Sequence, residues 1–276
     1  MKGIISGIKR MEIHDGDGLR TTVFFKGCPL KCAWCHNPES ISYLPECAFF
    51  EEKCIRCGAC GGKRNIETKE YCPTGAIHRF GDEYTVVELL SAILIDEPFF
   101  QYGGGVTLSG GECLSQPSFA IALAKELKKR GISVYVDTCG YVPRDVIDGI
   151  MPYTDKFLYD VKAIDPDVHK KYTGRDNKLI LDNLKYIMEK GAAVEIRYPL
   201  VKGCNDGECE KIAEFLKSIG GVEGVKVLKY HRLSESRYEA LGMENTLPDT
   251  VTLDSDVDSA KEIFKKHGIR VVNDGA

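Results

Sequence analysis

Three cysteines near the start of the sequence have a spacing that suits an iron-sulfur cluster. Cys28, Cys32 and Cys35 follow the pattern Cys-x3-Cys-x2-Cys on a short loop after a predicted strand. Three thiolates can hold three irons of a 4Fe-4S cubane and leave the fourth iron open, whereas a closed electron-transfer cluster needs four cysteines. The alternative is a structural zinc site, which would need a fourth ligand such as His36. The sequence therefore favours a cluster whose open iron can bind a further molecule.

Five further cysteines lie in the segment 46–80, which has neither a helical nor a strand period. A disulfide scaffold would spread the cysteines more evenly, and cytoplasmic proteins keep thiols for metals or redox work. We therefore expect an insert held by metal, with structural zinc as the alternative to a cluster. Four scattered cysteines have no metal spacing and are expected to be buried or incidental thiols: Cys113, Cys139, Cys204 and Cys209.

Glycines and acids follow the next predicted strands. Gly110 and Gly111 let the backbone approach a ligand closely, and the carboxylate of Glu112 can meet a cation there. An ordinary strand-to-helix turn is the alternative. Charged residues at the ends of apolar parallel strands are more often functional than structural. The later strands and their ends supply Asp137, Thr138, Asp160, Lys162, Arg197 and His231. The alternative for the acids and Lys162 is an internal Asp-Lys salt bridge. The alternative for His231 is an ordinary solvated histidine.

These residues need a sheet that brings strand ends together. Short β-branched runs alternate with longer helical patterns, which indicates repeated βα units and a parallel sheet. The predicted strands span 21–26, 106–109, 133–137, 157–161, 194–200 and 225–230, and the clearest predicted helices span 85–96, 118–130, 176–190 and 208–219. Six such units predict an α/β fold, an incomplete (β/α)6 TIM-like barrel, with the site on the loops after the strands.

Composition limits the class of protein. The chain has 276 residues, 43% of them hydrophobic, and a net charge of −4. We expect one main domain over 1–45 and 81–276, interrupted by the small insert 46–80. There is no long run of one charge, no apolar run of membrane-spanning length and no N-terminal leader, so we expect a cytoplasmic protein with neither nucleic acid nor a membrane as partner.

The first cysteine motif resembles the signature of the radical S-adenosylmethionine (SAM) superfamily, including an aromatic residue, Trp34, before the last cysteine. The resemblance implies that SAM chelates the open iron and that an electron from the cluster cleaves it to a 5′-deoxyadenosyl radical, which abstracts hydrogen. It also implies that Trp34 lies near the adenine, unless the ring simply packs under the loop. Gly110, Gly111 and Glu112 resemble the superfamily motif that binds the methionyl ammonium group.

The same resemblance implies roles for the later strand ends. In this superfamily, residues matching Asp137, Thr138, Asp160 and Lys162 surround the SAM carboxylate and ribose, and the acids sometimes hold a monovalent cation. The resemblance also implies that Arg197 and His231 contact the cofactor.

Three longer stretches resemble the glycyl-radical-enzyme activating enzymes: the N-terminal run from His14 to Arg20, the Trp-Cys-His-Asn-Pro-Glu run, and the glycine-rich run that ends at Glu112. This resemblance implies that the substrate is a backbone glycine of a partner enzyme, which loses a Cα hydrogen. It assigns Asp15, Gly16 and Gly18 to the binding of the partner's glycine loop. The family usually has a proline where this chain has Asp17, so how the loop receives the partner is open.

The insert resembles a reduced ferredoxin with one of its two cluster motifs deleted. In such ferredoxins the last cysteine of each motif ligates the other cluster. The resemblance therefore implies one auxiliary 4Fe-4S cluster, held by Cys54, Cys57, Cys60 and Cys72, whereas Arg64 occupies the remaining ligand position. Cys47 is either a free thiol or an alternative ligand.

Three functions remain in competition on the sequence. The first is an activase, reduced by a flavodoxin or ferredoxin and serving a glycyl radical enzyme such as a hydroxyproline or diol dehydratase. The second is a radical SAM enzyme that acts on a small molecule or a peptide. The third is a non-catalytic iron-sulfur electron carrier or a zinc-stabilised binding protein.

Overall fold

The computed structural model describes residues 1–65, 67, 70 and 72–272, and in this part of the chain the main sheet has eight strands. Six parallel strands follow the order β2-β6-β7-β8-β9-β10, and β1 and β5 extend the sheet beyond β2 in antiparallel pairing. The strands are β1 (Lys2–Glu12), β2 (Arg20–Phe25), β5 (Asp82–Thr85), β6 (Gly105–Gly110), β7 (Ser133–Thr138), β8 (Lys156–Asp160), β9 (Val194–Leu200) and β10 (Gly224–Lys229).

The six parallel strands are the six that the sequence predicts, with ends shifted by a few residues at most. The sheet does not close on itself, because β10 and β5 form its two edges. The prediction of an incomplete barrel is therefore confirmed. β1 and β5 were not predicted, since β1 mixes charged and apolar residues and β5 has only four residues.

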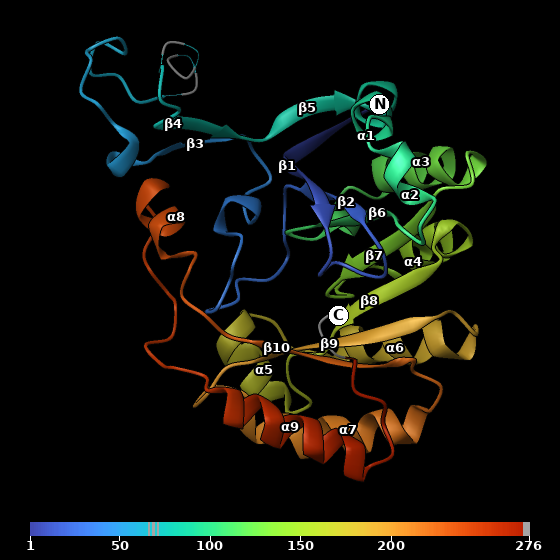
Figure 1. Cartoon of the computed structure of the whole chain (residues 1–276). Helices are drawn as coiled ribbons and strands as arrows, with labels where there is room; N and C mark the ends of the chain where they lie inside the picture. Colours follow the sequence, from blue (N-terminus) through green and yellow to red (C-terminus); the bar gives the residue numbers. More distant parts are fainter. Residues whose placement is uncertain (66, 68–69, 71, 273–276) are drawn as a thin grey trace.

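Helices connect the strands and cover one face of the sheet (Figure 1). They are α1 (Val86–Leu94), α2 (Glu97–Phe100), α3 (Pro117–Lys129), α4 (Arg144–Ile150), α5 (Pro166–Thr173), α6 (Lys178–Glu189), α7 (Cys209–Ile219), α8 (Glu235–Ala240) and α9 (Asp254–Lys266). The four predicted helices correspond to α1, α3, α6 and α7. The first ends earlier than predicted, because the chain turns after Leu94 and begins the separate short helix α2. Among the described residues, no helix has the length and apolar character needed to cross a bilayer.

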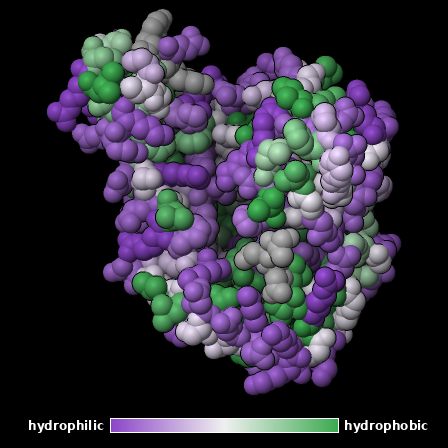
Figure 2. Space-filling view, viewed as in Figure 1, coloured by the Kyte–Doolittle hydropathy of each residue, from purple (hydrophilic) through white to green (hydrophobic). Residues whose placement is uncertain are grey.

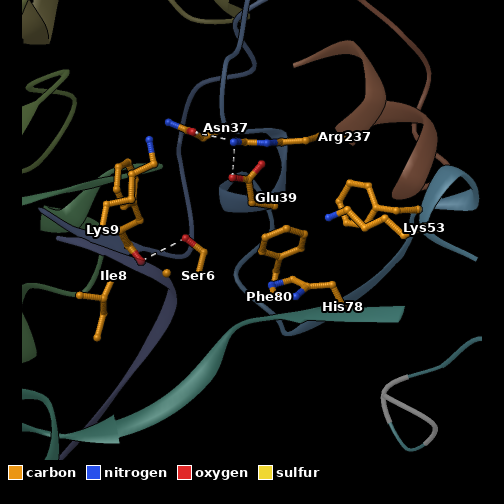
Figure 3. Close-up of a pocket in the computed structure, with 12 residues that line it drawn as sticks. Ser6, Ile8, Lys9, Asn37, Glu39, Lys53, His78, Phe80 and Arg237 are labelled. Atoms are coloured by element: carbon orange, nitrogen blue, oxygen red, sulfur yellow. Dashed lines mark hydrogen bonds and ion pairs between the residues drawn. The ribbon is translucent and has the colours of Figure 1, made fainter. Parts of the chain in front are cut away.

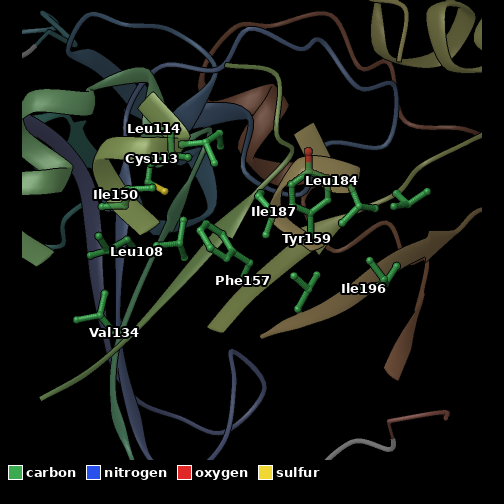
Figure 4. Packing of buried hydrophobic residues seen from close by; sticks show 14 of the residues in the cluster. Leu108, Cys113, Leu114, Val134, Ile150, Phe157, Tyr159, Leu184, Ile187 and Ile196 are labelled. Carbon is green, nitrogen blue, oxygen red and sulfur yellow. The ribbon is translucent and has the colours of Figure 1, made fainter. Parts of the chain in front are cut away.

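The two faces of the parallel sheet differ in polarity. On the face under the helices, Val134, Phe157 and Ile196 pack with Leu184 and Ile187 in the main core (Figure 4). Neighbouring residues of a strand point to opposite faces. The opposite face, called the inner face below, therefore carries the alternate residues, and most of these are polar: Thr107, Ser109, Tyr135, Asp137, Lys156, Asp160, Glu195, Arg197 and Lys226. A parallel sheet covered on both faces would be apolar throughout, so the inner face is built to meet polar groups.

The segment 46–80 stands out from the sheet on the side away from α3 and α4 (Figure 1). Its ends pair as a two-stranded antiparallel sheet of β3 (Glu46–Phe49) and β4 (Ile77–Phe80). The expectation that this segment lacks strands is therefore wrong at its borders. Four-residue strands are too short to show a period. The four positions 66, 68, 69 and 71 of this insert lie outside the described residues.

Candidate functional site

The cysteine loop, residues 28–35, directly follows β2 and is fixed by backbone hydrogen bonds to two other segments. The amide of Cys28 donates to the carbonyl oxygen of Ile41 at 3.1 Å, and the amide of Ala33 donates to that of Tyr172 in α5 at 2.8 Å. The loop therefore has one anchor close in sequence and one far from it. The three cysteines are held near the end of β2 by the fold itself.

The three thiols of this loop are close enough to influence one another electrostatically. Burial raises the pKa of Cys28 and of Cys32, and raises the pKa of Cys35 to about 12. A negative charge on Cys32 further raises the pKa of both Cys28 and Cys35. Only thiolates ligate metals, so positive charge from bound iron would favour the form that burial disfavours. The site suits a cationic centre.

A single metal ion and a cluster place different demands on their ligands. In the part of the chain that the structure describes, no three His, Cys, Asp or Glu side chains converge closely enough to hold one metal ion. A zinc ion requires its ligands to meet at one point. A cubane binds each thiolate through a different iron, so its ligands can stand further apart. Ligation of a cluster by Cys28, Cys32 and Cys35 stays a prediction.

Gly110 and Gly111 are required by packing against β2 and the cysteine loop. Gly110 has a φ of +116°, and a Cβ there would lie 2.2 Å from the backbone nitrogen of Phe25. A Cβ on Gly111 would lie 2.3 Å from the carbonyl oxygen of Ser40 and 3.0 Å from the Cβ of Cys28. The two glycines therefore let the end of β6 touch the segments that carry the thiols. From the sequence we expected Gly110 and Gly111 to allow the close approach of a ligand. Their packing is a second reason why glycine is needed at both positions.

The Glu112 side chain is buried and joins the ends of β6 and β7. Its carboxylate accepts hydrogen bonds from the Thr138 hydroxyl at 2.9 Å, the Cys139 amide at 2.8 Å and the Leu114 amide at 3.0 Å. Burial raises the pKa of Glu112, and these donors oppose the rise. The structure thus brings Glu112 and Thr138 together. Contact between this carboxylate and an ammonium group stays a prediction.

Acids gather on the inner face beside β8. Asp137 accepts a hydrogen bond from the Ser109 hydroxyl at 2.6 Å, and Asp160 forms an ion pair with Lys162. Burial raises the pKa of Asp137 to about 7; the Arg197 guanidinium opposes this shift, while the charge of Asp160 adds to it. The internal salt bridge considered as an alternative is therefore present. This salt bridge involves Asp160 and Lys162 and does not include Asp137.

Arg197 holds the loop that follows β1. Its Nη1 lies 3.4 Å from Oδ1 of Asp15, and its Nη2 donates to the carbonyl oxygen of His14 at 2.9 Å. The buried Nε of Arg197 has no hydrogen-bond partner among the described residues. The structure thus groups Arg197 with the loop assigned to the partner. A contact with the cofactor, which the sequence analysis assigns to it, stays a prediction.

Residues 14–19, called the first loop below, pack tightly against β7 and the segment before β6. A Cβ on Gly16, whose φ is +123°, would lie 2.4 Å from the Tyr135 ring. A Cβ on Gly18, whose φ is +68°, would lie 2.5 Å from the backbone of Gly103. Only glycine fits at these two positions without strain or overlap. The close packing of this loop explains both glycines before any partner is considered.

Asp17, at the position where the family resemblance led us to expect a proline, is bound to the inner face. Its carboxylate accepts from the Tyr135 hydroxyl at 2.7 Å and pairs with Lys156 at 2.7 Å. Lys156 also pairs with Glu223 at 2.8 Å, so one lysine joins the first loop to the segment before β10. The sequence analysis did not identify Tyr135 or Lys156. Polar residues at every second position of these strands were the signal that could have found them.

Trp34 is part of the cysteine loop, and His231 contacts His36, the residue that follows this loop. Trp34 is 6% exposed and packs against Tyr172, with 5.7 Å between ring centroids. It belongs to a small second core, so its packing under the loop is present in the structure. The His231 ring stacks on His36 with 4.2 Å between centroids. Burial lowers the pKa of His36 to about 4, so this stack forms between rings of which at least one is neutral.

A cleft of about 350 Å³ separates the insert from the sheet (Figure 3). Glu39, which follows the cysteine loop, stands on its wall and accepts a hydrogen bond from Arg237 in α8 at 2.8 Å. Lys53, next to Cys54, lines the opposite side. Figure 2 shows the same hollow between the insert and the body of the protein. The cleft therefore lies between the two groups of cysteines.

The cysteines of the insert differ in their surroundings. Backbone hydrogen bonds, chiefly from Ile77, lower the pKa of Cys72. Burial raises the pKa of Cys47, whose Sγ lies 3.8 Å from the carbonyl oxygen of Arg64. Cys72 is therefore the better of the two as a thiolate. Ligation by Cys54, Cys57, Cys60 and Cys72 stays a prediction.

Comparison with known proteins agrees with this geometry. Residues 22–216 match the model of the Radical SAM superfamily. A trans-4-hydroxy-L-proline dehydratase activating enzyme of Clostridioides difficile is 40% identical, covering 87% of this chain and 88% of its own length. A choline trimethylamine-lyase activating enzyme of Oleidesulfovibrio alaskensis is 36% identical, covering 98% of this chain and 97% of its own length.

A solved structure gives the same result for the fold. A domain of a pyruvate-formate lyase-activating enzyme from Bacteroides vulgatus superposes with a TM-score of 0.52 at 29% identity, and the match covers 62% of this chain and 98% of that domain. The cysteine loop after the first parallel strand, the polar inner face and these similarities all agree. The chain belongs to the radical SAM superfamily, within its glycyl-radical-enzyme activating enzymes.

Proposed function

We propose that this activating enzyme serves a dehydratase that acts on hydroxyproline or on a small diol. Members of its family form a radical on a backbone glycine of a partner enzyme, and this chain does the same. The specific partner is inferred from one observation, the 40% identity to a hydroxyproline dehydratase activating enzyme over 87% of the chain. That dehydratase is therefore the first partner to test.

The cysteine loop is the proposed ligand set of the catalytic cluster. Cys28, Cys32 and Cys35 hold three irons of a 4Fe-4S cluster and leave the fourth iron for SAM. When bound, the cluster and SAM supply a 5′-deoxyadenosyl radical. The support from geometry is the fixed backbone of this loop and the mutual influence of its thiols. Trp34 gives the loop a buried apolar base and lies beside the adenine in this proposal.

The inner face and the adjacent strand ends are the proposed seat of SAM. Gly110 and Gly111 bring the backbone close, and Glu112 and Thr138 offer acceptor oxygens to the methionyl ammonium group. The remaining cofactor-binding residues are Asp137, Asp160, Lys162, Arg197 and His231. The charge balance supports this role, because the charges of the half-buried Asp137 and Asp160 act on each other and Lys162 pairs only with Asp160. A monovalent cation or the ammonium group of SAM would offset the remaining negative charge.

The first loop is the proposed receiver of the partner's glycine. Asp15, Gly16 and Gly18 lie on a segment that reaches Arg197 on the inner face. A glycine seated there would approach the inner face on which we place SAM. The ion pair of Asp17 with Lys156 takes the place of a proline's rigidity in holding this loop.

The insert is proposed to hold one auxiliary 4Fe-4S cluster through Cys54, Cys57, Cys60 and Cys72, with Cys47 left as a thiol. The division into a barrel over 1–45 and 81–276 and an insert over 46–80 belongs to this proposal. The electron donor is a flavodoxin or a ferredoxin. Twelve cysteines without a disulfide support a reducing, cytoplasmic setting.

The test uses a panel of partners. The anaerobically reduced enzyme with SAM is mixed separately with a trans-4-hydroxyproline dehydratase, a diol dehydratase and a choline lyase, and the glycyl radical is measured by electron paramagnetic resonance. We expect the strongest signal with the hydroxyproline dehydratase and no signal with the Cys32→Ala variant. A radical only on the choline lyase would overturn the proposed partner. No radical on any partner, together with SAM cleavage coupled to a small-molecule product, would overturn the proposed site for a protein glycine.

A further inference from the structure

Five large apolar side chains are exposed on two neighbouring segments of the surface. They belong to residues 11–13, at the end of β1, and 95–102, around α2. Their exposed fractions are 45% for Met11, 50% for Ile13, 68% for Ile95, 42% for Phe99 and 76% for Tyr102. We call these five residues the apolar rim. Scattered single exposed apolar residues are ordinary, whereas a group of them marks an interaction site.

Several contacts hold the two segments of the rim together. Nη1 of Arg10 lies 2.6 Å from Oδ2 of Asp96, and its Nη2 donates to the carbonyl oxygen of Ala92 at 2.8 Å. The first of these bonds connects the residue before Met11 with the residue after Ile95, and the second connects it with the end of α1. The two segments that carry the rim are therefore fixed next to each other.

The rim also adjoins the first loop. Gly18 packs against Gly103, the residue after Tyr102, so closely that a Cβ on Gly18 would overlap it. The Gly105 amide donates to the carbonyl oxygen of Leu19 at 3.2 Å. Both contacts stand where the parallel strands begin. Figure 2 shows apolar side chains gathered over the part of the surface that carries α2 and the loop after β1.

Met11 is held in a conformation that few residues adopt. Its φ is +60°, in the left-handed region, at the point where the pairing of β1 with β2 shifts in register. A non-glycine residue costs about 1 kcal/mol or more in this region, and such strain persists where the surrounding structure imposes it. The bulge breaks the alternation of β1, and the Met11 side chain remains 45% exposed beside Ile13.

We propose that the apolar rim is the docking surface for the partner glycyl radical enzyme. This inference rests on the proposed role of the first loop as receiver of the partner's glycine. A protein that delivers a glycine to that loop must bring its own surface against the residues around it, and those residues are the rim. A second copy of this chain seated on the rim would instead cover the first loop and block the substrate.

The rim and the first loop would then have separate tasks. The first loop handles the few residues around the glycine, whereas the rim contacts the folded body of the partner. A short peptide that contains the glycine sequence can reach the loop without touching the rim. Full-length partner and short peptide should therefore respond differently when the rim is altered.

The test compares Tyr102→Ser and Phe99→Ser with a matched control, Val251→Ser, whose side chain is 72% exposed far along the sequence. The partner is the enzyme that gives the strongest radical signal in the panel above. Binding is measured by calorimetry and radical yield by electron paramagnetic resonance, with full-length partner and with a peptide of its glycine loop. We expect the rim variants to bind the full-length partner about ten-fold more weakly. Their radical yield with the peptide should equal that of the wild type, and Val251→Ser should behave like the wild type with both substrates.

Two outcomes would overturn the inference. The first is that both rim variants bind and activate the full-length partner as the wild type does. The second is that the wild type forms a dimer that the rim variants lose, which would assign the rim to self-association. Reductive cleavage of SAM without any partner is measured in parallel. If the wild type cleaves SAM but no partner and no peptide acquires a radical, the proposed function itself is wrong. That result would be distinct from a failure of the rim as the docking surface.

Discussion

The cysteine loop and the insert both offer thiols to a cluster, but the chain holds them differently. The loop rests on buried Leu30 and Trp34 and is tied by backbone hydrogen bonds to the rest of the fold. In the insert, every residue from Glu51 to Asn65 is exposed except Cys54 and Cys60, which are half-buried. The first site is thus positioned by the sheet before metal binds. The second has few buried side chains of its own, so we predict that it depends on bound metal for order.

The largest expected effect separates the two groups of ligands. Cys32→Ala should abolish SAM cleavage, because the open-iron cluster needs all three thiolates, and should remove about four irons per chain. Cys57→Ala should remove a similar amount of iron and leave SAM binding to the first cluster. Iron content, together with the change that SAM causes in the resonance spectrum of the reduced cluster, measures both.

The control for this comparison is Cys204→Ala, a cysteine without metal spacing. It should keep the full iron content and the response to SAM. If Cys57→Ala abolished the response to SAM while Cys204→Ala kept it, the two regions would not be independent and the comparison would fail.

Removal of iron should affect the insert far more than the sheet. After anaerobic chelation we expect amides of residues 46–80 to exchange hydrogen much faster, because few buried apolar contacts hold them. Amides of β6 and β7 should keep their protection, since the core under the helices is independent of metal. Hydrogen exchange measured by mass spectrometry checks this. Equal loss of protection in both regions would contradict the contrast drawn above.

A substitution at Glu112 measures how much the hydrogen bonds at the ends of β6 and β7 stabilise the fold. Glu112→Gln places an NH2 group where the carboxylate now accepts from Leu114 or Cys139. A buried donor facing a donor costs about 1–3 kcal/mol, so denaturant unfolding should show a loss of this size. A matched exposed change, Glu126→Gln on α3, should alter stability by less than about 0.5 kcal/mol. Equal stability of both variants would mean that Glu112 does not stabilise the strand ends.

The sequence predicted the sheet-held region well because its signals are local. Six strands and four helices follow from periodicity, and Cys28, Cys32 and Cys35 from spacing. The contacts of Arg197 and Asp17 could not be predicted, since they join residues more than 100 positions apart. The strands β3 and β4 were missed because a four-residue segment has no readable period. The polar alternation of β7 to β10 was readable, and it marks the inner face.

The last expected effect concerns charge on the inner face. Burial raises the pKa of Asp137 from 3.8 in the unfolded chain to about 7 in the folded protein. The folded state therefore binds this proton more tightly, and the side chain destabilises the fold progressively as the pH rises from about 4 to about 7. The slope is at most about 1.4 kcal/mol per pH unit. Asp137→Asn removes it, so the stability of the variant minus that of the wild type should rise across this window.

Urea unfolding of the metal-free protein at a series of pH values measures this difference. The exposed pair of Lys178 with Asp182 on α6 provides the control. The pKa of Asp182 is lowered in the fold by its lysine, so Asp182→Asn should show a small change of opposite sign below pH 4 and almost none between 4 and 7. A flat difference for Asp137→Asn would mean that Arg197 fully compensates the acid. The inner face would then carry no unbalanced charge to offer to SAM or to a cation, and its role would reduce to holding the first loop.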